Sequence, residues 1–127
     1  WNVKEGKCMK TLEGHTSSIC CLTVFDGYLV SGSYDKTIKI WNVEEGKCMK
    51  TLEGHTSTIL CLTVFNGFLV SGSGDKTIKI WNVKEGKCMK TLEGDTSTTF
   101  CLTVFDGCLV SGTSESEIKI WKSPFAL

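Results

Sequence analysis

Apolar residues occur along the chain in short runs that are separated by tight-turn residues. The run Thr58–Phe65 (TILCLTVF) is short and rich in β-branched residues, which favours a largely buried strand. Asn66-Gly67 follows it, and an Asn-Gly pair between two apolar runs is the strongest short-range signal of a β-hairpin, because both turn residues need positive φ. The pattern therefore predicts a hairpin whose second strand is Phe68–Ser73.

Two further strands are predicted after this hairpin. A tight turn at Gly74-Asp75-Lys76 leads into Thr77–Asn82, where Ile78, Ile80 and Asn82 alternate with Thr77, Lys79 and Trp81. This alternation is typical of a strand with two different faces. A polar turn at Val83–Gly86 then leads to Lys87–Glu93, a fourth and more polar strand. The unit thus consists of four short antiparallel strands, and no helical periodicity competes with this interpretation.

The unit is present three times. The segment SGSYDKTIKIWN at Ser31–Asn42 recurs at Ser71–Asn82 and, with more changes, at Ser111–Lys122. Four tryptophans set a period of 40 residues: Trp1, Trp41, Trp81 and Trp121. A fixed period in this range is typical of repeat architectures, and a four-stranded antiparallel unit is one blade of a β-propeller. We therefore expect an all-β fold, a partial β-propeller of three blades with the first strand of each blade nearest the axis.

The whole chain, residues 1–127, is expected to form one propeller segment with repeats at approximately 7–46, 47–86 and 87–122. Lys7–Glu13 has the sequence of an outer strand and is assigned to a preceding, absent blade. The last blade lacks its own outer strand, because the tail after Trp121 is short and Pro124 cannot donate a ladder hydrogen bond. Two explanations stay open. Either upstream blades of the same protein are missing, which the absence of an initial Met favours, or a homo-oligomer closes a ring head to tail.

Charge and cysteine content narrow the possible partners. The 14 Lys balance the 14 Asp and Glu and there is no Arg, which argues against nucleic acid or a membrane as partner. The apolar runs are far too short to span a bilayer. The eight cysteines follow the repeat and lack zinc spacing, so we interpret them as reduced core thiols in an intracellular protein, cytoplasmic or nuclear, without metal or cofactor.

Several motifs resemble the WD-repeat family over nearly the whole chain. They are the Gly-His pairs at Gly14-His15 and Gly54-His55, the SGSxDKTIKIW segments, and the Trp-Asn endings at Asn42 and Asn82, where the family usually has Trp-Asp and the third repeat has Lys122. The resemblance implies a structural hydrogen-bonded network in each blade. Carried over by position, its members are His15, Ser31, Asp35 and Trp41 in the first set and His55, Ser71, Asp75 and Trp81 in the second.

A Ser, His and Asp set also invites interpretation as a catalytic triad. A triad is expected once, beside an oxyanion hole, and not in every repeat, so we predict no catalytic residue and no enzyme activity. The third repeat has a degenerate network: Asp95, Ser111, Glu115 and Trp121. Two facing carboxylates cannot both be ionised and bonded to each other, so we expect this blade to lack the network and to be the least stable.

The resemblance also implies a binding surface. Partners of the family dock on the top face, and the contact positions correspond to Ser18, Cys20, Tyr34, Thr58, Leu60, Gly74, Thr98, Phe100 and Ser114. Cys20, Leu60 and Phe100 are either buried residues of the inner strand or an apolar centre that binds a hydrophobic peptide anchor. We expect a non-catalytic protein–protein interaction scaffold. The alternative is the substrate-recognition part of an F-box/WD-repeat ubiquitin ligase, although such receptors bind phosphate through Arg, which this chain lacks.

Overall fold

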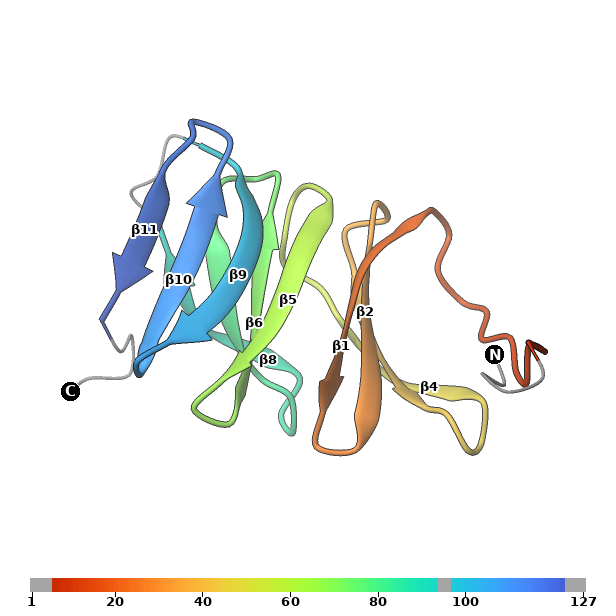
Figure 1. The fold of residues 1–127 in the computed structure, drawn as a ribbon. Helices are drawn as coiled ribbons and strands as arrows, with labels where there is room; N and C mark the ends of the chain where they lie inside the picture. The colour runs from red at the N-terminus through yellow and green to blue at the C-terminus, as the bar shows by residue number, and fades with distance from the viewer. Residues whose placement is uncertain (1–5, 94–96, 123–127) are drawn as a thin grey trace.

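The computed structural model describes residues 6–93 and 97–122, which contain eleven strands and no helix (Figure 1). Each predicted strand after residue 13 is present, with bounds within one residue of the expected ones. The strands are β1 (Ile19–Phe25), β2 (Tyr28–Ser33), β3 (Ile38–Asn42), β4 (Lys47–Leu52), β5 (Ile59–Phe65), β6 (Phe68–Ser73), β7 (Ile78–Asn82), β8 (Lys87–Leu92), β9 (Thr99–Phe105), β10 (Cys108–Thr113) and β11 (Ile118–Trp121).

These strands form three separate antiparallel sheets, which we call blade 1 (β1–β4), blade 2 (β5–β8) and blade 3 (β9–β11). Strand order within each sheet follows the sequence. The first strands of successive blades, β1, β5 and β9, lie next to one another, so the blades are stacked side by side around one edge (Figure 1). The predicted all-β architecture of three propeller blades is confirmed, and up to residue 122 the last blade has no fourth strand.

The hairpin turns have the backbone conformation that their sequences require. In blade 2, Asn66 and Gly67 have φ values of 51° and 78°. Asp26-Gly27 and Asp106-Gly107 adopt the same pair of positive φ values in blades 1 and 3. This matches the right-handed twist of the flanking strands and fixes the register of each inner hairpin.

The third strands of blades 1 and 2 depart from simple alternation. The register of β7 with β8 shifts between Ile80 and Trp81, and both of these neighbouring residues are buried. The same shift occurs between Ile40 and Trp41 in β3. Burial of adjacent residues shows that both faces of β3 and β7 are covered at this point.

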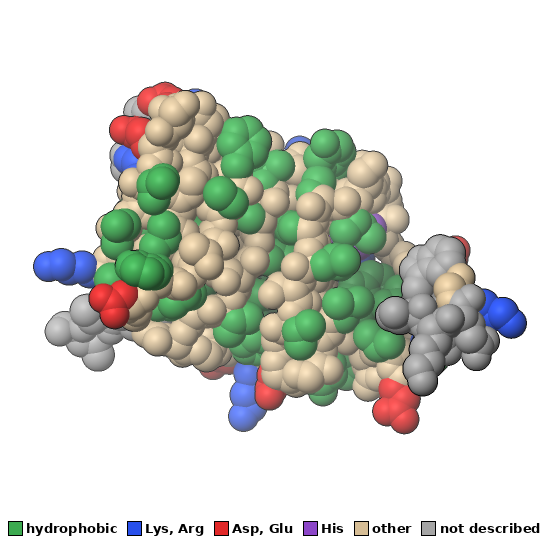
Figure 2. All heavy atoms as spheres, in the orientation of Figure 1, with side chains coloured by type: hydrophobic (Ala, Val, Ile, Leu, Met, Phe, Trp, Pro, Cys, Tyr) green, Lys and Arg blue, Asp and Glu red, His purple; other side chains and the backbone are tan. Residues whose placement is uncertain are grey.

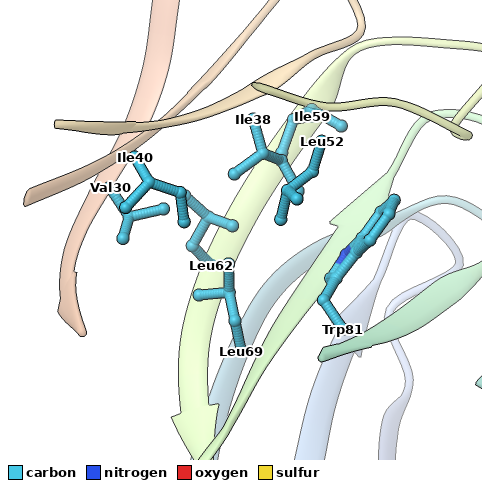
Figure 3. Packing of buried hydrophobic residues seen from close by; sticks show 8 residues of the cluster. All are labelled: Val30, Ile38, Ile40, Leu52, Ile59, Leu62, Leu69 and Trp81. Atoms are coloured by element: carbon cyan, nitrogen blue, oxygen red, sulfur yellow. The ribbon is translucent and has the colours of Figure 1, made fainter. Parts of the chain in front are cut away.

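The core lies between the blades. Val30, Ile38, Ile40 and Leu52 of blade 1 interdigitate with Ile59, Leu62, Leu69 and Trp81 of blade 2 (Figure 3). A second cluster joins Phe65, Val70, Ile78 and Ile80 of blade 2 to Leu109 of blade 3. Gly32 makes the first contact possible, since a Cβ there would lie 2.5 Å from Cγ2 of Ile59. Each blade therefore depends on its neighbour for its hydrophobic core.

The expectation of core thiols was wrong, and the assignment of residues 7–13 to the outer strand of a preceding blade stays a prediction. Residues 7–13 form no strand and contain an isolated bridge at Lys7, since no third strand of a preceding blade is available among the described residues to pair with them. The eight thiols are free, but Cys61 alone is buried, while four others are exposed and three are intermediate. Burial raises the pKa of the Cys61 thiol to about 12. Of the exposed thiols, Cys8 precedes the first strand and Cys48 lies on the outer strand β4. Cys20 and Cys101 lie on β1 and β9, the first strands of blades 1 and 3.

Candidate functional site

A chain of side-chain hydrogen bonds crosses blade 2 from the loop before β5 to strand β7. Nδ1 of His55 lies 2.8 Å from Oδ2 of Asp75, and Nε2 lies 2.7 Å from Oγ of Ser71. The indole N–H of Trp81 donates to the same hydroxyl at 2.8 Å. In a consistent arrangement the hydroxyl donates to Nε2 and Nδ1–H donates to the carboxylate. The structure thus brings together all four residues of the predicted set.

Blade 1 repeats this arrangement. His15 lies 2.8 Å from Asp35 and 2.6 Å from Ser31, and Trp41 donates to Ser31 at 2.8 Å. One member of the network, Thr37, was not predicted from the sequence. The hydroxyl of Thr37 donates to Oδ1 of Asp35 at 2.6 Å, and the backbone N–H of the same threonine donates at 2.9 Å.

Thr77 bonds Asp75 in the same way. The signal was available in the sequence, because both threonines stand two residues after the aspartate, where a hydroxyl readily bonds a turn carboxylate.

These contacts set the charges of the network. Burial of Asp75 favours the neutral acid, but hydrogen bonds from Thr77, His55 and the N–H of Thr56 outweigh it and lower its pKa to about 2. Burial also lowers the pKa of His55, although the neighbouring carboxylate opposes this effect. At neutral pH the network therefore contains an ionised aspartate and a neutral imidazole, which is the protonation state that the hydrogen bonds require.

The distances are those of a hydrolase triad, but the surroundings are not. The side chain of Ser71 is fully buried, and its oxygen already accepts the indole N–H of Trp81. Ser31 is buried in the same manner against Trp41. A nucleophile must reach a substrate carbonyl. These hydroxyls instead connect two strands and a loop, and a fully satisfied buried network of this kind rigidifies the fold.

Blade 3 retains a remnant of the network. Trp121 donates to Ser111 at 3.0 Å. Glu115, which takes the place of the turn aspartate, is exposed, and Asp95, which takes the place of the histidine, lies outside the described residues. Glu117 stands at the position that Thr37 and Thr77 occupy in the other blades. Among the described residues, buried oxygens without a hydrogen-bond partner occur at Ser97 and Thr99, both in this blade. The polar interior of blade 3 is therefore less well satisfied than that of blades 1 and 2.

The predicted top-face residues gather at one edge of the blades, the upper edge in Figure 1. Backbone hydrogen bonds hold them in pairs, from Tyr34 to Ser18, from Gly74 to Thr58 and from Ser114 to Thr98, at 2.9 to 3.0 Å. The other three positions are the second residues of β1, β5 and β9: Cys20, Leu60 and Phe100.

The exposure of these three residues distinguishes buried residues of the inner strand from an apolar binding surface. Phe100 is 54% exposed, Cys20 is exposed, and Leu60 is partly buried. None of them belongs to the core between the blades. Together with the exposed ring of Tyr34, they form what we call the upper-edge surface.

A lysine contact between blades was not predicted. Nζ of Lys50, on β4, donates to the backbone oxygens of Val83 at 2.8 Å and of Lys84, which lie in the β7–β8 turn of the next blade. Lys10 makes the same two contacts with Val43 and Glu44. Lys50 also lines a groove of about 480 Å³ between blades 1 and 2, with Phe25, Tyr28, Met49, Phe68 and Val83 among its walls. Sequence patterns show a polar outer strand but cannot show which carbonyls its lysines reach.

Over residues 6–93 and 97–122, no three side chains of the metal-ligating types gather closely enough to hold an ion. The same part of the chain contains no helix that could cross a membrane.

Known proteins support the architecture. The family model described as WD domain, G-beta repeat matches residues 6–42, 46–82 and 86–122. A mitochondrial division protein 1 from Neurospora crassa is 48% identical over 40 residues, and a probable E3 ubiquitin ligase complex SCF subunit sconB from Emericella nidulans is 52% identical over 40 residues. These matches cover 32% and 31% of this chain but 6% of each relative.

A solved structure of U3-55K superposes with a TM-score of 0.83 at 29% identity, covering 90% of this chain and 38% of that one. The three matched repeats, the shared fold and the bonded His, Ser, Asp and Trp sets agree. The chain belongs to the WD-repeat family.

Proposed function

We propose that this chain is a non-catalytic interaction module that binds a protein or peptide through its upper-edge surface. WD-repeat propellers act in general as interaction scaffolds. The observation that carries the proposal is the exposure of apolar side chains at the equivalent inner-strand position of blades 1 and 3. Phe100 is more than half exposed there, although an aromatic side chain in an apolar run is more often buried.

The chemistry of this surface favours an apolar anchor. Ser18, Thr58 and Thr98 stand two residues before the three apolar positions, and none of the nine predicted top-face residues carries a formal charge. Interfaces concentrate their binding energy in a few desolvated apolar or aromatic contacts that polar groups surround. A peptide with one aromatic or aliphatic anchor, flanked by hydrogen-bonding groups, therefore fits this surface best.

The free cysteines support a location for this binding. Free and partly exposed cysteines persist in a reducing compartment, and all eight cysteines of this chain are free. We therefore assign the module to the interior of the cell, cytoplasm or nucleus.

Selection of peptides from a random displayed library, with the 127-residue chain as bait, tests the proposal. Enriched peptides should share an apolar or aromatic anchor, and Leu60→Asp combined with Phe100→Asp should weaken their binding at least tenfold. Met89→Asp is the matched control, because Met89 is 50% exposed on the outer strand β8, away from this surface. Peptides that bind the double variant as tightly as the parent chain would show that the surface is elsewhere.

A second candidate is the substrate-recognition part of an F-box/WD-repeat ubiquitin ligase. The 52% identity to a probable SCF subunit over one repeat supports it. The upper-edge surface has no arginine to bind a phosphate in bidentate fashion, so we expect no preference for phosphorylated peptides. Fluorescence anisotropy with matched phosphorylated and unphosphorylated peptides separates the two candidates, and a preference of tenfold or more for phosphate would favour the ligase.

A further inference from the structure

The interface between blades occurs twice within the chain and uses the same residue positions each time. We define the exit side of a blade by the residues equivalent to Val70, Ile78 and Ile80, and the entry side by those equivalent to Ile59, Leu62 and Leu69. The exit side of blade 1 packs against the entry side of blade 2. The exit side of blade 2 packs in turn against blade 3, where Leu109 and Leu102 represent the entry side.

In the part of the chain that the structure describes, one entry side and one exit side have no neighbouring blade. On the entry side of blade 1, Ile19 is 50% and Leu22 is 61% exposed, although their equivalents in blade 2 are 0% and 9% exposed. On the exit side of blade 3, Ile118 is 78% and Ile120 is 66% exposed, against 1% and 0% for Ile78 and Ile80. Apolar side chains are visible at the surface of both the first and the third sheet (Figure 2). The two uncovered sides are the two halves of an interface that the chain already makes.

The strand edges show the same complementarity. Within the described residues, β11 has no strand on its outer edge, whereas β3 and β7 pair with β4 and β8. Residues 7–12 have the sequence KCMKTL, which is identical to that of β4 and β8, yet they form no strand, and all of them but Leu12 are exposed. Among the described residues blade 3 has no fourth strand, and residues 7–12 repeat the sequence that forms this strand in blades 1 and 2.

Residues 7–12 already lie where the fourth strand of a blade preceding blade 1 would be. Lys10 contacts the β3–β4 turn of blade 1 through the carbonyls of Val43 and Glu44. Lys50 of β4 makes the equivalent contacts with blade 2. The segment is therefore placed relative to blade 1 as β4 is placed relative to blade 2, and the remaining strands of a preceding blade would fill the space between.

We infer that a second copy of this chain supplies that blade. Blade 3 of the second copy packs its exit side on the entry side of blade 1, and residues 7–12 pair with β11 of the second copy as its fourth strand. The register of β7 with β8 places Leu12 opposite Ile118, Lys10 opposite Ile120 and Cys8 opposite Trp121.

The contact is head to tail, so it must be made twice to close a ring. Two copies give six blades, within the four to eight that propellers have, and three copies would give nine. The zero net charge of the chain opposes neither contact.

Solution mass tests this inference. The chain has a mass of 14.0 kDa, so size exclusion with light scattering should give twice that value, about 28 kDa. Combining Ile118→Asp with Ile120→Asp should reduce the mass to that of one chain, and circular dichroism should still show β structure because both side chains are exposed in the single copy. Met89→Asp, on an outer strand, should leave the dimer intact. A monomeric parent chain, any other stoichiometry, or a dimeric double variant would overturn the inference.

A mixing experiment tests the direction of the contact. One variant carries Ile19→Asp and Leu22→Asp on its entry side, and the other carries Ile118→Asp and Ile120→Asp on its exit side. Each alone should be monomeric, and the mixture should form a heterodimer through the one junction that stays intact. A mixture that remains monomeric, or an entry-side variant that still dimerises with itself, would contradict a head-to-tail interface.

Discussion

Blades 2 and 3 start from nearly the same sequence and end in different environments. Both form the inner hairpin with its Asn-Gly or Asp-Gly turn, and both place a tryptophan against a buried serine. Blade 2 adds His55, Asp75 and Thr77 to that contact and has neighbours on both sides, whereas Ile118 and Ile120 of blade 3 face solvent. Short-range sequence therefore determines where the strands form. The side-chain network and the neighbouring blade determine how stable each blade is.

The largest expected difference concerns the tryptophans. Trp81 is 1% exposed in the core between blades 1 and 2, whereas Trp121 is partly exposed. Trp81→Ala should lower the free energy of unfolding by about 3–5 kcal/mol, because it creates a cavity and removes the donor to Ser71. Trp121→Ala should have less than half that effect. Urea unfolding followed by circular dichroism measures both, and equal effects would contradict the difference between the blades.

The acidic position of the turn gives the next largest effect. Asp75→Asn removes the ionised acceptor of His55 and Thr77, and we expect a loss of about 2–3 kcal/mol in the free energy of unfolding. Glu115→Gln, at the equivalent position of blade 3, should change it by less than about 0.5 kcal/mol, because an exposed side chain outside any network contributes little. The same urea titration provides the measurement. A Glu115→Gln effect as large as that of Asp75→Asn would mean that blade 3 contains an equivalent network.

Acidification should weaken blade 2 through Asp75 and His55. The folded pKa of Asp75 is lowered to about 2, so its contribution is complete above the unfolded value near 4 and is lost as pH falls towards 2. That contribution is about 2 kcal/mol by linkage. The pKa of His55 is also lowered, so the unfolded chain takes up its proton first and stability begins to fall below about pH 6.5. Urea midpoints from pH 7 to pH 3 should decrease throughout, and less steeply in Asp75→Asn.

The last expected effect, smaller than the losses above, is a gain in stability. Thr99 occupies the position of Ile59 and Ile19, and its buried hydroxyl has no partner among the described residues. Thr99→Ile should raise the free energy of unfolding by about 1 kcal/mol, since it removes an unsatisfied polar group and fills the same space that Ile59 fills in blade 2. The reverse change, Ile59→Thr, is the matched control and should destabilise. A loss of stability in Thr99→Ile would show that the hydroxyl is bonded.

Much of this molecule could be predicted from sequence because its determinants are local. Asn66-Gly67 specifies a turn through the φ values that it tolerates, and the flanking runs specify strands to within a residue. The family motif placed His55, Ser71, Asp75 and Trp81 in one set, and the structure brings them within hydrogen-bond distance.

What could not be predicted depends on neighbours. Residues 7–12 and β4 have identical sequences. However, β4 pairs with β3, and residues 7–12 have no such neighbouring strand among the described residues. Cys61 and Cys101 also occupy one repeat position, and they differ in burial because blade 3 covers the first of them. Lys50 reaches carbonyls of the next blade that no local pattern identifies. Repetition in sequence therefore predicts repetition in structure only where the surroundings repeat as well.

Amide hydrogen exchange of two matched hairpins tests the role of the network most directly. The β5–β6 hairpin (residues 59–73) and the β9–β10 hairpin (residues 99–113) have the same turn and the same strand register, so they differ mainly in side-chain contacts. We expect slower exchange in residues 59–73 of the parent chain, and in Asp75→Asn we expect their exchange to rise towards that of residues 99–113. Equal exchange in the parent chain, or no change in the variant, would contradict the claim that the network holds its blade.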